Sequence, residues 1–181
     1  MVDGSSGKER LEVTGLALRA EPGLHAAALR YFERQGVFAD AVCALIGAAP
    51  PAALAAAAAA GSAGEGELLL AWSRPTETLV FTTDVVRLAE LQSRLAGVPG
   101  GCCVDLSGGL RVLRVTGERV AELLCRLGSA CVPRLNEARR SRLAEVPVLA
   151  LCVQEGETLL AVDRAYAPHL MGWIRETLAD F

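Results

Sequence analysis

Hydrophobic residues in the first third of the chain recur at spacings that predict one strand followed by two helices. We expect a strand over Leu11–Arg19 and a helix over Glu21–Gln35, whose first turn accommodates Pro22. One side of that predicted helix carries Leu24, Ala28, Tyr31 and Phe32. A second helix is predicted from apolar residues spaced i, i+3, i+4 and i+7, and Gly47 ends it. Its apolar stripe consists of Phe38, Ala41, Val42 and Leu45.

The rest of the chain repeats a pattern of two strands followed by a helix. The predicted strand pairs are Glu67–Trp72 with Glu77–Thr83, Cys102–Ser107 with Leu110–Val115, and Leu143–Gln154 with Thr158–Asp163. The helices that follow them are Val85–Ala96, Glu118–Leu127 and Tyr166–Leu178. Tight turns between successive strands imply antiparallel pairing, because parallel neighbours need a long crossover. The sequence therefore predicts an α+β fold in which helices pack on antiparallel sheet, within a single domain over residues 11–181.

Two segments lie outside this regular pattern. We interpret residues 1–10 (MVDGSSGKER) as a flexible tail, which lacks the apolar stretch of a secretory signal. Residues 48–66 form a low-complexity alanine and glycine connector, for which a loose helix and a surface loop are both open. The apolar run Ala41–Ala60 contains Pro50 and Pro51 and is mainly alanine, so it is too weak to insert into a membrane.

Composition narrows the classes of function. A formal net charge of −3 gives no electrostatic basis for binding nucleic acid. A hydrophobic content of 52% is high for a domain that stands alone, and it is compatible with a face that a partner protein covers. The 6 cysteines form no CxxC motif and no zinc-type Cys/His spacing. We interpret them as reduced thiols that pack as small apolar side chains in a cytoplasmic protein.

The segment VDLSGGLRVLRVTGERVAELL is the strongest candidate for chemistry. Asp105 and Ser107 lie two residues apart on a predicted strand and so share one face. Gly108–Gly109 does not match a phosphate-binding loop, because a strand and not a helix follows it; a hairpin turn with positive φ explains the glycines instead. We expect the two polar side chains to hydrogen-bond the backbone of this turn. Catalysis by the pair is the alternative hypothesis.

Three other features are candidates for a site or an interface. The two histidines, His25 and His169, each lie in the first turn of a predicted helix without a second ligand or a nucleophile motif nearby. Trp173 is predicted to be a core residue of the last helix. A run of basic residues is either a solvated loop or a surface for an acidic partner. Its candidate partner-interface residues are Arg139, Arg140 and Arg142.

Four motifs lie in a distinctive order between residues 67 and 180. They are AWSRPTETLVF (Ala71–Phe81), VDLSGGLRVLRVTGERVAELL (Val104–Leu124), LAEVPVLAL (Leu143–Leu151) and DRAYAPHLMGWIRETL (Asp163–Leu178). In order and spacing they resemble the small gamma subunit of heterotetrameric sarcosine oxidases. That subunit is itself similar to the folate-binding domain of the glycine-cleavage T-protein, an aminomethyltransferase. The chain departs from the family pattern at Thr78, where an aromatic residue is usual, and at Ala165, where a capping serine is common.

The resemblance implies a non-catalytic small subunit of a flavin-dependent amine oxidase or demethylase. In that family the partner subunits hold FAD, FMN, NAD and tetrahydrofolate, while the small subunit binds no cofactor or metal. It packs against the large folate-domain subunit and stabilises it, alongside a flavin-binding subunit. Two alternatives stay open: a stand-alone folate-binding aminomethyltransferase-like protein, and an adaptor that only stabilises an unrelated partner. The resemblance leaves the identity of the amine open.

Overall fold

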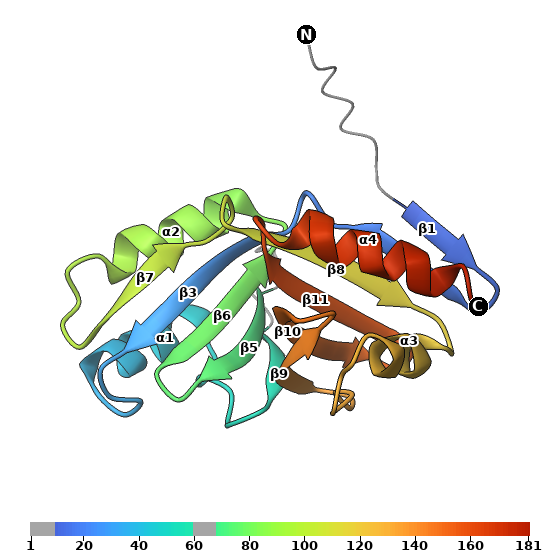
Figure 1. Ribbon diagram of the computed structural model, residues 1–181. Helices are drawn as coiled ribbons and strands as arrows, with labels where there is room; N and C mark the ends of the chain where they lie inside the picture. Colours follow the sequence, from blue (N-terminus) through green and yellow to red (C-terminus); the bar gives the residue numbers. More distant parts are fainter. Residues whose placement is uncertain (1–9, 60–67) are drawn as a thin grey trace, which may run out of the picture.

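A computed structural model describes residues 10–59 and 68–181, which form two antiparallel sheets with helices beside them (Figure 1). In order across the six-stranded sheet lie β1 (Arg10–Val13), β2 (Leu16–Ala20), β8 (Leu110–Thr116), β11 (Glu157–Asp163), β10 (Val146–Gln154) and β9 (Glu137–Leu143). The five-stranded sheet contains β4 (Ala56–Ala59), β5 (Leu68–Arg74), β6 (Glu77–Thr82), β3 (His25–Tyr31) and β7 (Gly101–Asp105). The helices are α1 (Val37–Ile46), α2 (Val85–Leu95), α3 (Val120–Arg126) and α4 (Ala167–Leu178).

Three separate apolar cores show how these elements stack. One core joins the six-stranded sheet to α3 and α4, and includes Leu113 and Leu170. A second core, which includes Phe81 and Leu151, lies between the two sheets. The third joins the five-stranded sheet to α1 and α2 and contains Phe38. Each sheet is therefore apolar on both faces, and the molecule is built as four layers in the order helices, sheet, sheet, helices.

The α+β class and the antiparallel pairing predicted from the sequence are confirmed. Strands β5 and β6 form the expected hairpin, with Pro75 in its turn, and β10 pairs with β11. Helix α2 begins where expected, because Asp84 Oδ1 accepts hydrogen bonds from the backbone N–H groups of Val86 (2.9 Å) and Arg87 (3.0 Å). Gly47 ends α1 in the left-handed conformation, with φ of 74°. Helix α3 starts after Arg119, two residues later than the predicted start at Glu118, and no side chain caps it.

The helix predicted over Glu21–Gln35 is wrong, because the segment forms strand β3 between β6 and β7. Both faces of β3 are buried: Ala26 and Ala28 face the core between the sheets, and Leu29 and Tyr31 pack in the core beneath α1 and α2. A strand buried on both faces carries apolar residues at nearly every position, so some of them also satisfy helical spacing.

Two other predicted segments divide differently in the structure. The strand expected over Leu11–Arg19 is a hairpin of β1 and β2, and Gly15 lies in its turn with φ of 75°. Part of the predicted connector is strand β4, which pairs with β5. Residues 60–66 of the connector, and residues 1–9 of the predicted tail, lie outside the part of the chain that the structure describes.

The predicted pairing of Cys102–Ser107 with Leu110–Val115 is wrong. Strand β7 pairs with β3 in one sheet, whereas β8 pairs with β2 and β11 in the other. Gly108–Gly109 therefore carries the chain from one sheet to the other instead of closing a hairpin. Neither glycine has positive φ, so the turn does not need glycine for its backbone conformation.

Candidate functional site

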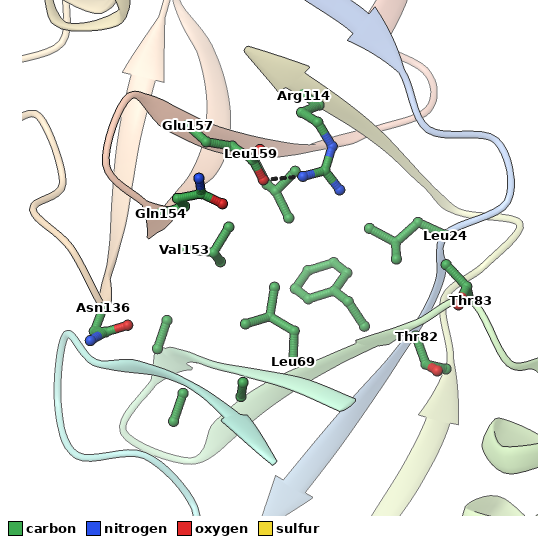
Figure 2. Close-up of a pocket in the computed structure, with 14 residues that line it drawn as sticks. Leu24, Leu69, Thr82, Thr83, Arg114, Asn136, Val153, Gln154, Glu157 and Leu159 are labelled. Carbon is green, nitrogen blue, oxygen red and sulfur yellow. Dashed lines mark hydrogen bonds and ion pairs between the residues drawn. The ribbon is translucent and has the colours of Figure 1, made fainter. Parts of the chain in front are cut away.

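The first candidate site is a pocket of about 360 Å³ that opens between the two sheets (Figure 2). Its apolar wall includes Leu24, Leu69, Phe81, Val153 and Leu159, and its polar side chains are Thr82, Thr83, Arg114, Asn136, Gln154 and Glu157. Six strands and the loops beside them contribute to these walls, so no local motif in the sequence marks the pocket. Its volume is at the lower end of the range of about 300–1,000 Å³ typical of small-molecule sites. We name it the inter-sheet pocket.

The charged groups of the inter-sheet pocket neutralise one another. Arg114 on β8 donates from Nε to Glu21 Oε1 at 2.6 Å and also pairs with Glu157 on β11 (Figure 2). Arg19 joins the same carboxylate of Glu21 at 2.7 Å. The pocket is therefore apolar in one part and lined by hydroxyl and amide groups in another. The described lining residues include no cysteine or histidine that could act as a nucleophile or a base.

At the crossing between the sheets, Asp105 makes the turn contact expected of it, whereas the Ser107 hydroxyl bonds strand β3 and not the turn. Asp105 Oδ1 accepts from the backbone N–H of Ser107 at 2.8 Å. Ser107 Oγ accepts from the N–H of Ala26 at 3.1 Å and donates to its carbonyl at 3.3 Å. The backbone N–H of Ser107, followed by its side chain, holds the pKa of Asp105 below its usual value. These bonds fasten the start of the crossing to β3.

The structure brings His25 near Asp105, although the two are far apart in sequence. His25 begins strand β3, not a helix, and β3 runs antiparallel to β7. Among the described residues, however, no hydrogen bond joins His25 to Asp105 or Ser107, and the hydroxyl of Ser107 is engaged by the backbone of Ala26. His169 lies in the first turn of α4, as predicted. The geometry gives Ser107 no base, so the alternative hypothesis of catalysis by this pair gains no support.

The arginine run lies on edge strand β9, a strand that was not predicted, and not in a loop. Arg139 is held by Glu137 at 3.1 and 3.2 Å, and Arg142 by the carbonyl of Glu145 at 2.8 Å. Arg140 reaches the other sheet, where it donates to the backbone carbonyl of Ser73 at 2.9 Å and to its Oγ at 2.6 Å. Arg140 therefore ties the two sheets together. Its proposed contact with a partner, like those of Arg139 and Arg142, stays a prediction.

Trp173 was predicted to be core but is 53% exposed. The buried stripe of α4 consists of Ala167, Leu170, Met171, Ile174 and Leu178. Trp173 lies next to Ile174 in sequence, but its side chain is not part of the buried stripe of the helix. Phe32, at 85% exposed, and Val37, at 63%, are further large apolar side chains on the surface. Phe32 and Val37, together with Phe38 and Pro99, line a mainly apolar hollow beside α1.

The prediction that the cysteines pack in the core holds for Cys152 alone among the six. Four others are exposed, and Cys103 is partly buried. Burial, and then the neighbouring Cys102, raise the pKa of Cys103 to about 11, so it stays protonated at neutral pH. All six are free thiols. Within residues 10–59 and 68–181, no group of three or more His, Cys, Asp or Glu side chains could hold a metal ion. No helix in the same residues is long and apolar enough to cross a membrane.

Comparison with known proteins finds similarity in structure and not in sequence. No protein-family model matches the chain, and no curated protein matches it. The structure is similar to a chain of the heterotetrameric sarcosine oxidase from Corynebacterium sp. U-96 in complex with pyrrole 2-carboxylate. The TM-score is 0.79 at 24% identity, over 92% of this chain and 85% of that one.

A second similar structure is the glycine cleavage system aminomethyltransferase T from Bartonella henselae. The TM-score is 0.65 at 14% identity, over 88% of this chain. The match covers only 45% of the aminomethyltransferase, so the chain spans less than half its length. The fold expected from the sequence resemblance is confirmed by both similarities.

Proposed function

We propose that the chain is a non-catalytic small subunit of a flavin-dependent, heteromeric amine oxidase or demethylase of the sarcosine oxidase kind. It packs against the large folate-domain subunit and stabilises it. The observation that carries this proposal is the extent of the structural similarity. Nearly the whole of this chain matches nearly the whole of one chain of a heterotetrameric oxidase, with 92% and 85% covered.

The same comparison favours a subunit over a stand-alone aminomethyltransferase. The aminomethyltransferase has more than half of its length outside the matched region. The neutralised charges of the inter-sheet pocket also favour a binding or structural role, because Arg114 is already paired with Glu21 and Glu157.

Under this proposal the cofactors belong to the partner subunits. FAD, FMN, NAD and tetrahydrofolate are expected there, and none on this chain. A dinucleotide pyrophosphate fits a glycine-rich turn that leads directly into a helix. The turn at Gly108–Gly109 leads into strand β8 and so does not fit this group. The free thiols support a reducing compartment, the cytoplasm.

Affinity purification of the tagged chain from its native host tests the proposal. We expect a flavin-containing subunit and a large folate-domain subunit to co-purify, and the complex to show flavin absorbance. The chain expressed alone should be colourless. Co-purification with a protein that holds no flavin would favour the adaptor alternative. Micromolar binding of tetrahydrofolate to the isolated chain, measured by calorimetry, would favour the aminomethyltransferase-like alternative.

A further inference from the structure

Three arginines from three different strands surround one carboxylate at a second opening between the sheets. Glu77 on β6 accepts from Arg30 Nε of β3 at 3.1 Å, through Oε2. Its other oxygen, Oε1, lies 3.5 Å from Arg140 Nη2 of β9 and 4.0 Å from Arg74 Nε of β5. Ser73 Oγ donates to the same Oε1 at 2.8 Å. We name Arg30, Arg74, Glu77 and Arg140 the arginine cluster.

The arginine cluster carries more positive charge than Glu77 balances. The carboxylate of Glu77 is nearly buried, with 10% of its side chain exposed, and it faces three cations. The arginine side chains are much more open, from 39% exposed for Arg140 to 62% for Arg74. Burial, and then the charge of Arg74, lower the pKa of Arg140. An added anion would relieve this crowding of like charges.

The cluster borders a hollow of about 350 Å³ with an apolar floor. This floor consists of Leu79, Leu106, Leu110, Leu149 and Ala161, which belong to the core between the sheets or pack against it, and Tyr166 also lines the hollow. The hollow shares no lining residue with the inter-sheet pocket. Asp163, the other acid that lines it, accepts from the backbone N–H of Ala165 at 2.8 Å. Positive charge at the mouth and leucine below form an amphipathic site of ligand size.

We propose that this hollow binds a small organic carboxylate, with its charged group against Arg74 and Arg140 and its apolar body on the leucine floor. The guanidinium group suits this ligand, because its planar donors match the two oxygens of a carboxylate. The apolar floor selects an anion that carries a hydrocarbon part over inorganic phosphate or sulfate. The proposal uses residues of this chain alone and does not depend on the function proposed above.

Calorimetric titration of the purified chain with hexanoate tests the proposal, and hexanamide serves as the neutral probe of the same shape. We expect saturable binding of hexanoate that weakens as salt is added, and no saturable binding of hexanamide. Arg74→Gln should weaken hexanoate binding at least tenfold. Arg74 is the informative position because its guanidinium lies 4.0 Å from Glu77, beyond hydrogen-bonding distance, so its loss leaves the bonds of Glu77 intact.

Arg142→Gln is the matched control, since Arg142 lies two residues from Arg140 on β9 and pairs with Glu145 outside the hollow. It should bind hexanoate as the unmodified chain does. Arg140→Gln should lose binding as well, but it also removes bonds to Ser73, so thermal unfolding must first show that this variant is folded. The absence of saturable hexanoate binding would overturn the proposal. Equal affinity for hexanamide, or unchanged affinity in Arg74→Gln, would do the same.

Discussion

At the scale of single residues, the packing of α1 on β7 depends on the missing side chain of Gly101. A Cβ at this position would lie 2.4 Å from the carbonyl oxygen of Arg30 and 2.4 Å from the ring of Phe38. Gly101→Ala should therefore force α1 or β3 to move and cost about 1–3 kcal/mol of stability. Chemical denaturation measures this loss.

Gly108→Ala is the control for that substitution. A Cβ at position 108 would meet no atom within 4 Å, and φ there is not positive. The free energy of unfolding should change by less than about 1 kcal/mol. Alanine lowers the conformational entropy of the unfolded chain, and this effect acts to raise the free energy of unfolding. Equal losses in Gly101→Ala and Gly108→Ala would contradict the packing assigned to Gly101.

Glu77 should make the stability depend on pH in the acid range. Burial raises the pKa of Glu77, but the hydrogen bond from Ser73 and the Arg30 guanidinium together lower it by more. The folded-state pKa therefore lies below the usual value. A depressed carboxyl pKa stabilises the fold above the unfolded-state pKa, and this stability is lost as pH falls through the folded-state pKa. Urea unfolding from about pH 6 to about pH 3 should show the loss.

The Glu77→Gln variant separates this carboxylate from the other acids. It should be less stable at neutral pH by about 1–3 kcal/mol, because Arg30 and Arg140 lose their partner, and its stability should fall less steeply in acid. An unchanged acid slope would mean that Glu77 does not carry this pH dependence.

Asp105 should contribute to stability and not to turnover. It is exposed, and it makes one bond to the backbone of Ser107, so Asp105→Ala should cost about 0.5–1.5 kcal/mol. Asp105→Asn keeps an acceptor and should recover most of that loss. In the oxidase complex proposed above, turnover normalised to flavin should stay within a few-fold of that of the unmodified complex. A correctly assembled complex slowed about a hundred-fold would identify Asp105 as a general acid or base.

At the scale of elements, the start of α2 is set by a single side chain. Asp84 accepts from two backbone N–H groups that have no partner within the helix. Asp84→Ala should lower stability by about 1 kcal/mol, measured as a lower Tm, whereas Asp84→Ser should retain most of the cap. An unaffected Tm in Asp84→Ala would show that packing of Leu88 and Leu91 alone positions the helix.

The elements that the sequence predicts well are those whose pattern has one physical cause. Helix α2 has an N-cap, one apolar stripe and a solvated face, so its limits can be read directly. Strand β3 misleads because both of its faces are buried, and strand β9 because it lies at an edge and carries four polar residues over Arg139–Arg142. The alanines of β4 favour no single structure strongly enough to predict a strand.

The arginine cluster and the contacts of Asp105 and Ser107 show how far a site can be predicted from the sequence. Arg30, Arg74 and Arg140 are far apart in sequence, and only the pairing of strands and the stacking of the sheets bring them to Glu77. No spacing rule predicts such a cluster. The bond that Asp105 accepts was predictable because its donor is a backbone group two residues away, whereas the bonds of the Ser107 hydroxyl to Ala26 were not.

At the scale of the whole molecule, the surface should behave as one that a partner covers. Phe32, Val37, Val86 and Trp173 are each more than half exposed. We therefore expect the chain to self-associate or to be poorly soluble when expressed alone, and to be rescued by co-expression with the large subunit of the complex proposed above. Light scattering after gel filtration measures the state of the isolated chain. A monomer that remains stable at high concentration would contradict this expectation.

The long-range pairing of β2 with β8 has a consequence for biosynthesis. Ala17 pairs with Thr116, so the strand that completes this edge of β2 is made about one hundred residues later. At synthesis rates of about 5–20 residues per second, β2 waits roughly 5–20 s for its neighbour. An unpaired strand edge is a template for wrong pairing during that interval. The six-stranded sheet should therefore assemble only near the end of translation, and its yield in the cell should depend on what shields the nascent chain until β8 emerges.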